Sequence, residues 1–564
     1  MKDFIPFQNI GLCFSGGGYR ATFFSLGVVS YYNRIKYQDK PLLDNVEAIS
    51  TVSGGTLFGV AYAKASQAPD FNFEDFFKRV YDKFKPENDV LLTTAIQKLG
   101  DDQVWKDNPH KKRSLINAFA LTYADMTDIY GGSFDMFLDE EKLANLKYIC
   151  FNSTEFSFGL AFRFQNTGLF GNKALSNKLL DTLEKQLQLG DIAASSSCFP
   201  LGFEPLVFPD DYIKDQTSTD YKNVKSLKYF DNGVGVMDGG IADNQGIGSM
   251  MNISASRKRN KDLKKELDLI VVNDVGSFKM DPWEPVAKKK DESYSIKSVV
   301  SKAMDYLKIK SIYIILLLAG ILLMVLNSME IFKGQAWPAL YITGGIVTGI
   351  GLLLTLFGLG ASIGKGMLVR SVKSLFNKNV PEPLVDDVLS FKKLSVGLIQ
   401  RMLTERISST VIMVNDIFLK QIRRLNYRLL YSDPDLRHKI ITSTVYELNG
   451  EKTPYNKSFS YNKNIDPAPS TLLKSVGLIA SEMPTTLWWD ETDIKKNRMD
   501  ALIACGQFTS CYKLMDYVLK LKNSKRANLT DEETAAIDAL YDALESDWKK
   551  FNENPMFYVD SLKS

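Results

Sequence analysis

The sequence has few of the side chains that usually act as catalytic bases or hold metals. It contains two histidines in 564 residues, His110 and His438, and both lie in charged segments without a motif beside them. An imidazole base, the common partner of a catalytic serine, is therefore not expected. The five cysteines show neither metal-ligand spacing nor a disulfide framework, and they fit a reducing compartment such as the cytoplasm. They are Cys13, Cys150, Cys198, Cys505 and Cys511.

An excess of charge of one sign is also absent. The 69 Lys and Arg residues against 66 Asp and Glu leave a formal net charge of +3, which does not favour a nucleic-acid partner. Residues 1–6 lack the apolar core of a signal peptide. Basic runs occur locally, between residues 257 and 265 and at 288–290. They are typical of solvated helix faces or linkers, or of contact with anionic lipid head groups.

What the sequence does contain is a small glycine motif between a predicted strand over 46–52 and a predicted helix over 54–65. Its residues are Thr51, Val52, Ser53, Gly54 and Gly55. A serine at such a turn is pushed out above a sheet, beside the free N–H groups of the first helical turn. The usual nucleophile elbow has glycine two positions before the serine, where this chain has Thr51. The alternative is a glycine-rich helix start with Ser53 as its N-cap.

A second glycine-rich segment follows a predicted strand over 10–14. Its residues are Ser15, Gly16, Gly17, Gly18, Tyr19 and Arg20. A strand, a glycine loop and a helix start form an anion-binding arrangement, because backbone N–H groups converge there. In an acyl hydrolase the anion is the oxyanion of the tetrahedral intermediate, which Gly16, Gly17 and Gly18 would hold. Arg20 would either add positive charge to this site or form a surface salt bridge.

The same segment fits a dinucleotide-binding motif through Gly16, Gly18 and Ala21. That motif expects an acidic residue near the end of the second strand, to hold the ribose. The second predicted strand ends instead in the motif around Ser53. Nucleotide binding is therefore the less favoured interpretation.

A third motif, formed by Asp238 with Gly239 and Gly240, offers a carboxylate that can lie close to another part of the backbone. Asp231 competes for the same role, but its Asn-Gly neighbours suit an ordinary turn. With no imidazole in a suitable motif, the residues favour a dyad of Ser53 and Asp238. Burial beside Ser53 would raise the pKa of Asp238 and make it a better base.

The three motifs, in this chain order, resemble those of the patatin-like phospholipase family. Residues 194–200 are similar to the Ala-Ser-rich, Pro-containing stretch that the family carries between serine and aspartate, and the strand-like residues 267–274 follow the base. The resemblance covers about residues 8–276. It implies a three-layer α/β/α fold and hydrolysis of ester bonds in phospholipids or lysophospholipids. It implies no metal and no organic cofactor, and Thr51 is where the chain departs from the family pattern.

Two long apolar runs occupy residues 312–326 and 339–363. A membrane span needs about 20 such residues, so they predict a two-helix transmembrane hairpin, with a buried hairpin as the alternative. Lysines before the first run, and Lys365 and Arg370 after the second, place both large parts of the chain in the cytoplasm.

The predicted organisation is an α/β chain of four parts. They are a catalytic core over 1–280, a linker and helix over 281–310, the transmembrane hairpin over 311–364, and a mainly helical region over 365–564 that packs on the core. The predicted function is a membrane-anchored serine acyl hydrolase whose substrate is bilayer phospholipid. The alternatives are a catalytically inactive scaffold or sensor of the same fold, and acyl transfer to an acceptor other than water. Nothing in the sequence predicts the oligomeric state.

Overall fold

A computed structural model defines the fold. It describes residues 5–172, 175, 183–200, 202–260, 265–276, 311–329, 337, 340–349, 405, 409–410, 412–450, 461–523 and 529–564. The chain divides into two compact units. The first combines Met1–Met280 with Asp416–Ser564, and the second is Asp281–Asn415.

A sheet of eight strands forms the centre of the first unit. The strands are β1 (Ile10–Phe14), β4 (Val46–Val52), β5 (Tyr148–Glu155), β6 (Leu160–Gln165), β7 (Leu206–Phe208), β8 (Val234–Asp238), β9 (Leu269–Asp274) and β10 (Ile440–Thr444). Their order is β10-β9-β1-β4-β5-β8-β7, and β6 pairs with β5. The pairs from β10 to β5 are parallel, whereas those of β6, β7 and β8 are antiparallel. The two short strands β2 (Lys36–Tyr37) and β3 (Lys40–Pro41) form a separate ribbon.

The helices between the strands of this unit are mostly short. They are α1 (Gly18–Arg34), α2 (Gly54–Ala65), α3 (Phe73–Phe84), α4 (Leu91–Gly100), α5 (Asp102–Asp107), α6 (Leu115–Asp125), α7 (Leu183–Gln186), α8 (Leu189–Ser196), α9 (Thr219–Ser226), α10 (Gly240–Asp243) and α11 (Ile247–Arg259). The C-terminal part of the chain is mainly helical, as predicted. It contains α18 (Leu419–Ser432), α19 (Thr471–Ser481), α20 (Glu491–Lys495), α21 (Arg498–Lys522), α22 (Asp531–Glu553) and α23 (Phe557–Lys563).

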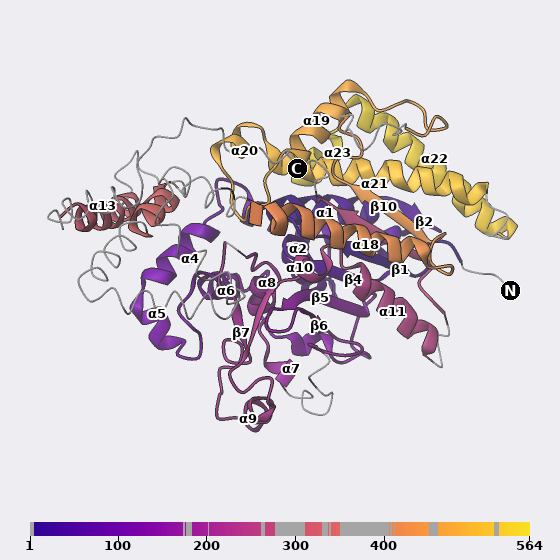
Figure 1. The fold of residues 1–564 in the computed structure, drawn as a ribbon. Helices are drawn as coiled ribbons and strands as arrows, with labels where there is room; N and C mark the ends of the chain where they lie inside the picture. Colours follow the sequence, from indigo (N-terminus) through magenta and orange to yellow (C-terminus); the bar gives the residue numbers. More distant parts are fainter. Residues whose placement is uncertain are drawn as a thin grey trace, which may run out of the picture. The chain divides into compact units, whose positions relative to one another are not determined.

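Alternate residues of the central strands enter two separate apolar cores, because successive side chains of a strand point to opposite faces. Leu12 and Phe14 of β1 belong to one core, and Cys13 between them belongs to the other. The first core also holds side chains of α1, α2 and α21, and the second holds those of α11 and α18. The sheet therefore lies between two layers of helices (Figure 1), and the predicted α/β class is confirmed.

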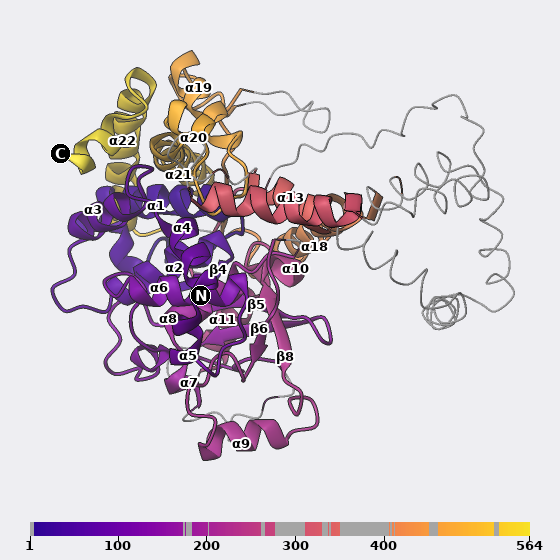
Figure 2. The ribbon, with the colours of Figure 1, turned by 90° about the vertical axis from the view of Figure 1, so that its left-hand side faces the viewer.

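The C-terminal helix α21 lies against α1 in both views (Figures 1 and 2). Two glycines allow the close approach. A Cβ on Gly27 of α1 would come within 2.0 Å of the Ile503 carbonyl, and one on Gly506 of α21 within 2.3 Å of the Phe24 carbonyl. The first unit is thus built from two parts of the chain that are distant in sequence.

Among the described residues of the range 311–364, the predicted transmembrane hairpin is not found. Within the part of the chain that the structure describes, no helix is both long and apolar enough to cross a membrane. The described residues of this range include helix α13 (Ser311–Ser328), with 18 residues. Residues 350–364 and the predicted linker over 281–310 lie outside the described residues. The predicted domain boundaries stay predictions.

Candidate active site

Ser53 lies at the tight turn between β4 and α2. Its φ of 53° and ψ of −124° are rarely adopted by a residue with a side chain, and such strain is typical of a nucleophile elbow. Ser53 occupies the N-cap position of α2, but its side chain makes no capping hydrogen bond. Its side chain instead lies close enough to Asp238 to lower the pKa of that carboxyl group, against the effect of burial. The conformation therefore differs from that of an ordinary serine N-cap.

Thr51, which replaces the usual glycine, fits without disturbing the elbow. It pairs within the sheet with Phe14 of β1 and Phe151 of β5. Its side chain lies against Gly59 of α2, where an added Cβ would come within 2.6 Å of the Thr51 methyl group. The Thr51 hydroxyl lies 2.9 Å from that of Thr56. Gly59 of α2, which has no side chain, thus makes room for the branched side chain of Thr51 on β4.

The elbow and the glycine loop are in direct contact at Gly54. A Cβ on Gly54 would lie 1.9 Å from the carbonyl oxygen of Gly18, and one on Gly55 would lie 2.6 Å from that of Phe14. Any side chain at these positions would force the backbones apart. The two motifs, which are 36 residues apart between Gly18 and Gly54 in the sequence, therefore form one site.

The sheet topology brings Asp238 to Ser53. Val52, the last residue of β4, pairs with Asn152 of β5, and Asp238, the last residue of β8, pairs with the next residue, Ser153. Since β6 covers the other edge of β5, β4 and β8 follow one another along the same edge. Their ends meet, and the residue after Val52 is Ser53.

Asp238 is a buried carboxylate, with 2 % of its surface exposed. Its Oδ1 accepts the N–H of Gly240 at 2.7 Å. Burial raises the pKa of Asp238 to about 6, and the side chain of Ser53 and the N–H of Gly240 oppose this rise. Gly239 allows the close packing, because a Cβ there would lie 2.3 Å from the carbonyl oxygen of Asn152. A carboxylate in this state suits a general base at neutral pH.

The backbone N–H groups of the glycine loop differ in whether they already donate a hydrogen bond within the protein. The N–H of Gly16 donates to the carbonyl of Asn244 at 2.9 Å, and that of Tyr19 donates to the carbonyl of Thr486 at 2.8 Å. Within the described residues, the N–H groups of Gly17 and Gly18 have no acceptor. Both glycines have positive φ values, 149° and 54°. Gly17 and Gly18 are therefore the two members of the predicted trio whose N–H groups are available to an oxyanion.

The side chain of Arg20 contacts the end of α19 and the segment that follows it. It is buried in the first unit, and its Nη1 donates to the carbonyl of Met483 at 2.9 Å and to that of Ser481 at 3.5 Å. Burial lowers the pKa of Arg20 to about 10. Its guanidinium binds carbonyls at the end of α19, so neither of the two roles predicted for Arg20 describes these contacts.

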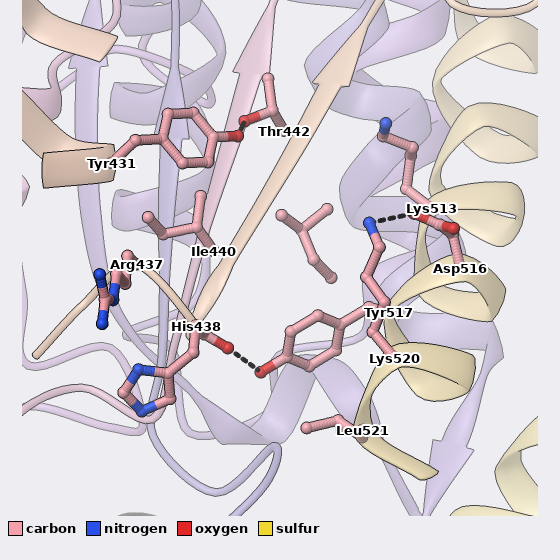
Figure 3. Close-up of a pocket in the computed structure, with 11 residues that line it drawn as sticks. Tyr431, Arg437, His438, Ile440, Thr442, Lys513, Asp516, Tyr517, Lys520 and Leu521 are labelled. Carbon is pink, nitrogen blue, oxygen red and sulfur yellow. Dashed lines mark hydrogen bonds and ion pairs between the residues drawn. The ribbon is translucent and has the colours of Figure 1, made fainter. Parts of the chain in front are cut away.

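The other candidate bases lie apart from Ser53. Asp231 is exposed in a turn, where its Oδ1 accepts the N–H of Asn232. Burial lowers the pKa of His110 to about 4, with further repulsion from Lys111 and Lys214. His438 lines a cavity of about 330 Å³ between α18, β10 and α21, which contains neither Ser53 nor Asp238 (Figure 3).

Two residues that the sequence did not single out as site residues also contribute to the site. Ser196, at the end of α8, accepts the N–H of Ser53 at 2.9 Å and lies 2.6 Å from the carbonyl of Asn152. The carbonyl of Asn244 accepts the N–H of Gly16. The side-chain oxygen of Asn244 lies 2.4 Å from the position that a Cβ on Gly16 would take. The sequence contained a signal for each residue, since Ser196 lies in the Ala-Ser-rich stretch and Asn244 follows the motif of Asp238.

The site contains no ligand set for a metal. Among the described residues, no group of three or more histidine, cysteine, aspartate or glutamate side chains is placed to hold an ion. The arrangement of hydroxyl, carboxylate and backbone N–H groups is the set required for acyl transfer through a serine.

Comparison with models of protein families gives a match over part of the chain. Residues 12–251 match a family model described as Patatin-like phospholipase, which confirms the resemblance predicted from the motifs. The matched residues include the glycine loop, Ser53 and Asp238. No curated protein matches the chain.

Proposed function

We propose that this chain, which carries a patatin-like phospholipase domain, is a serine acyl hydrolase that cleaves ester bonds of phospholipids or lysophospholipids. The family supports lipid acyl hydrolysis as the class of reaction. The observation that carries the assignment to a dyad is the sheet register. It places the ends of β4 and β8 on successive residues of β5, and so brings Asp238 to the strained elbow of Ser53.

In the proposed reaction, Asp238 accepts the proton of the Ser53 hydroxyl while Oγ attacks the ester carbonyl carbon. The tetrahedral intermediate collapses, the leaving alcohol takes the proton from Asp238, and an acyl group stays on Ser53. Water then gives its proton to Asp238 and attacks the acyl carbon, which releases the fatty acid and returns the proton to Ser53. A pKa of about 6 leaves Asp238 ionised at neutral pH and more basic than an exposed carboxylate.

The negative oxygen of each intermediate would be held by the N–H groups of Gly17 and Gly18. These groups lie at the first turn of α1, where the helix dipole also favours negative charge. Donors fixed before the reaction stabilise the developing charge without further rearrangement.

The alternative of an inactive scaffold was motivated by Thr51 and by the long C-terminal part. Thr51 is accommodated beside Gly59, so its presence does not argue against activity. Acyl transfer to an alcohol would use the same dyad and would differ only in the final acceptor.

A lipid bilayer is part of the proposal as the place of the substrate. Its support is the chemical class of the substrate and the apolar composition of residues 312–326 and 339–363. The cytoplasmic face is proposed for the dyad, from the basic residues that flank these runs.

The test compares the wild-type protein with Ser53→Ala and Asp238→Ala, on phosphatidylcholine vesicles and on lysophosphatidylcholine. Each variant should lose fatty-acid release by at least about 1000-fold while its circular dichroism stays that of the wild type. Asp231→Ala, which changes an exposed aspartate in a turn, should keep full activity and serves as the control.

A fluorophosphonate probe separates the alternatives, because it should label Ser53 stoichiometrically in an active hydrolase. Full activity in either dyad variant would contradict the proposal. Absence of both labelling and hydrolysis would favour the scaffold, and formation of new esters with added alcohol would indicate an acyltransferase. Sedimentation of the protein with vesicles tests the bilayer as a partner.

A further inference from the structure

A buried carboxylate that the dyad does not use lies at the end of β9. Asp274 has no exposed surface. Its Oδ2 accepts hydrogen bonds from Nε of Arg423 at 2.7 Å, from the hydroxyl of Tyr427 at 2.8 Å and from Nε2 of Gln245 at 3.2 Å. Its Oδ1 accepts the N–H of Gly276 at 2.8 Å. Because a buried charge is tolerated only when it is paired and hydrogen-bonded, Asp274 depends on Arg423.

The residues on both sides of Asp274 hold the start of the glycine loop. The carbonyl of Asn273 accepts the N–H of Ser15 at 3.0 Å, and the N–H of Val275 donates to Oγ of Ser15 at 2.9 Å. Ser15 directly precedes Gly16. The end of β9 therefore fixes the place from which the loop begins.

Gln245, another partner of Asp274, connects this cluster to the other side of the loop. The residue before it, Asn244, accepts the N–H of Gly16. The residue before that, Asp243, accepts a hydrogen bond from Nδ2 of Asn426 at 2.9 Å. Asn426 and Arg423 both belong to α18, so this one helix supports the loop from two directions.

Among the described residues, the Arg423 guanidinium donates hydrogen bonds to groups of three different residues. Besides Nε to Asp274, Nη1 donates to the carbonyl of Gly276 at 2.7 Å and Nη2 donates to the hydroxyl of Tyr446 at 2.6 Å. The side chain is buried, with 4 % of the residue exposed. A planar fork of fixed donors suits this arrangement, and the single ammonium group of lysine cannot reproduce it.

We propose that Arg423 is a positioning residue for the oxyanion loop. Through Asp274 it fixes Ser15 and Gly16, and so directs the N–H groups of Gly17 and Gly18 toward the intermediate formed on Ser53. This inference rests on the proposed function of the dyad. Arg423 lies outside the family match over residues 12–251, so the C-terminal part of the chain supplies a support for the site that the matched domain lacks.

The activity test compares Arg423→Ala and Arg423→Lys with Arg257→Ala. Arg257 is a matched control, because it is an equally buried arginine, with 3 % of its surface exposed, that is paired with Glu47 near the opposite end of β4. The loss of loop geometry should lower kcat of Arg423→Ala by about 10-fold to 100-fold with little change in KM. The kcat of Arg423→Lys should lie between those of Arg423→Ala and the wild type. Arg257→Ala should keep the wild-type kcat.

Hydrogen–deuterium exchange gives a measurement that needs no activity. The amides of residues 15–19 should exchange faster in Arg423→Ala than in the wild type, and Arg257→Ala should leave them unchanged. If Arg423→Ala does not fold, Tyr427→Phe removes one hydroxyl from Asp274 and should give a smaller change in the same direction.

The outcomes separate the two proposals. A wild-type protein without hydrolysis or labelling contradicts the proposed function, while the exchange data still decide the role of Arg423. Unchanged exchange over residues 15–19 in Arg423→Ala, or an equal rise in Arg257→Ala, overturns the positioning role.

Discussion

At the scale of single residues, the site contains two side chains held in states that oppose folding. Ser53 has a positive φ of 53°, and Asp238 is a buried carboxylate whose pKa is raised to about 6. Both conditions lower the stability of the folded state. In the proposed reaction both also serve reactivity, since the first exposes the nucleophile and the second provides a base. Such a conflict between stability and local geometry is typical of active sites.

Asp238→Asn should therefore abolish hydrolysis and stabilise the fold. The carboxyl pKa is about 6 in the folded protein and about 3.9 in an unfolded chain. Because the pKa is higher in the folded protein, the contribution of this group to stability is complete below pH 4 and is lost as the pH rises through 6. Asparagine avoids that loss, so at pH 7 the free energy of unfolding should rise by up to about 3 kcal/mol, with little change at pH 4. Urea unfolding at both pH values measures this, and a variant less stable than the wild type at pH 7 would contradict it.

The two residues of the proposed dyad could be singled out from the sequence because each lies in a short motif. The turn after an apolar strand marked Ser53, and a pair of glycines marked Asp238. Their supports could not be identified in this way. Ser196 binds Ser53 across 143 residues of sequence, and Arg423 binds Asp274 across 149. Such contacts depend on the order of the strands, which local patterns do not determine.

At the scale of elements, the site forms where strand ends and helix starts meet. The sequence predicted β4 and α2 with the observed bounds, because an apolar strand, a serine and two glycines leave little freedom there. Helix α1 begins at Gly18, within the glycine-rich segment. The reason is tertiary, since Thr486 accepts the N–H of Tyr19 and so satisfies the first turn.

Gly54→Ala tests this junction of elements. The added Cβ would lie 1.9 Å from the carbonyl oxygen of Gly18, so the elbow and the glycine loop must separate. Hydrolysis should fall by about 100-fold or more, and stability by about 2–3 kcal/mol. Gly100→Ala is the matched control, because nothing lies within 4 Å of its added Cβ at the end of α4. It should keep full activity and gain up to about 1 kcal/mol. Kinetics and thermal unfolding measure both effects, and equal behaviour of the two variants would contradict the role of this contact.

At the scale of the whole molecule, the family match ends at residue 251 while the sheet continues beyond it. Strands β9 and β10 and the helices α18 and α21 complete the sheet and cover its faces. Strand β10 lies in the region predicted to be mainly helical, and local periodicity could not tell which strand it would join. Its partner is β9, which it meets in parallel. The two apolar runs are a different case, because composition predicted a membrane hairpin, and the described residues contain no helix that could cross a membrane.

The dependence of the site on the C-terminal part predicts that Gly506→Ala, far from Ser53 in the sequence, lowers both stability and activity. The added Cβ would lie 2.3 Å from the carbonyl oxygen of Phe24, which forces α21 away from α1, the helix whose first turn holds Gly18. The clash should exceed the gain in helix propensity of about 1 kcal/mol, for a net loss of about 1–2 kcal/mol. Gly477→Ala in α19, whose nearest contact would be 3.3 Å, should change stability less. Calorimetry and ester hydrolysis measure both quantities. If Gly506→Ala kept the stability and turnover of the wild type, α21 would not be part of the structure that holds the oxyanion loop.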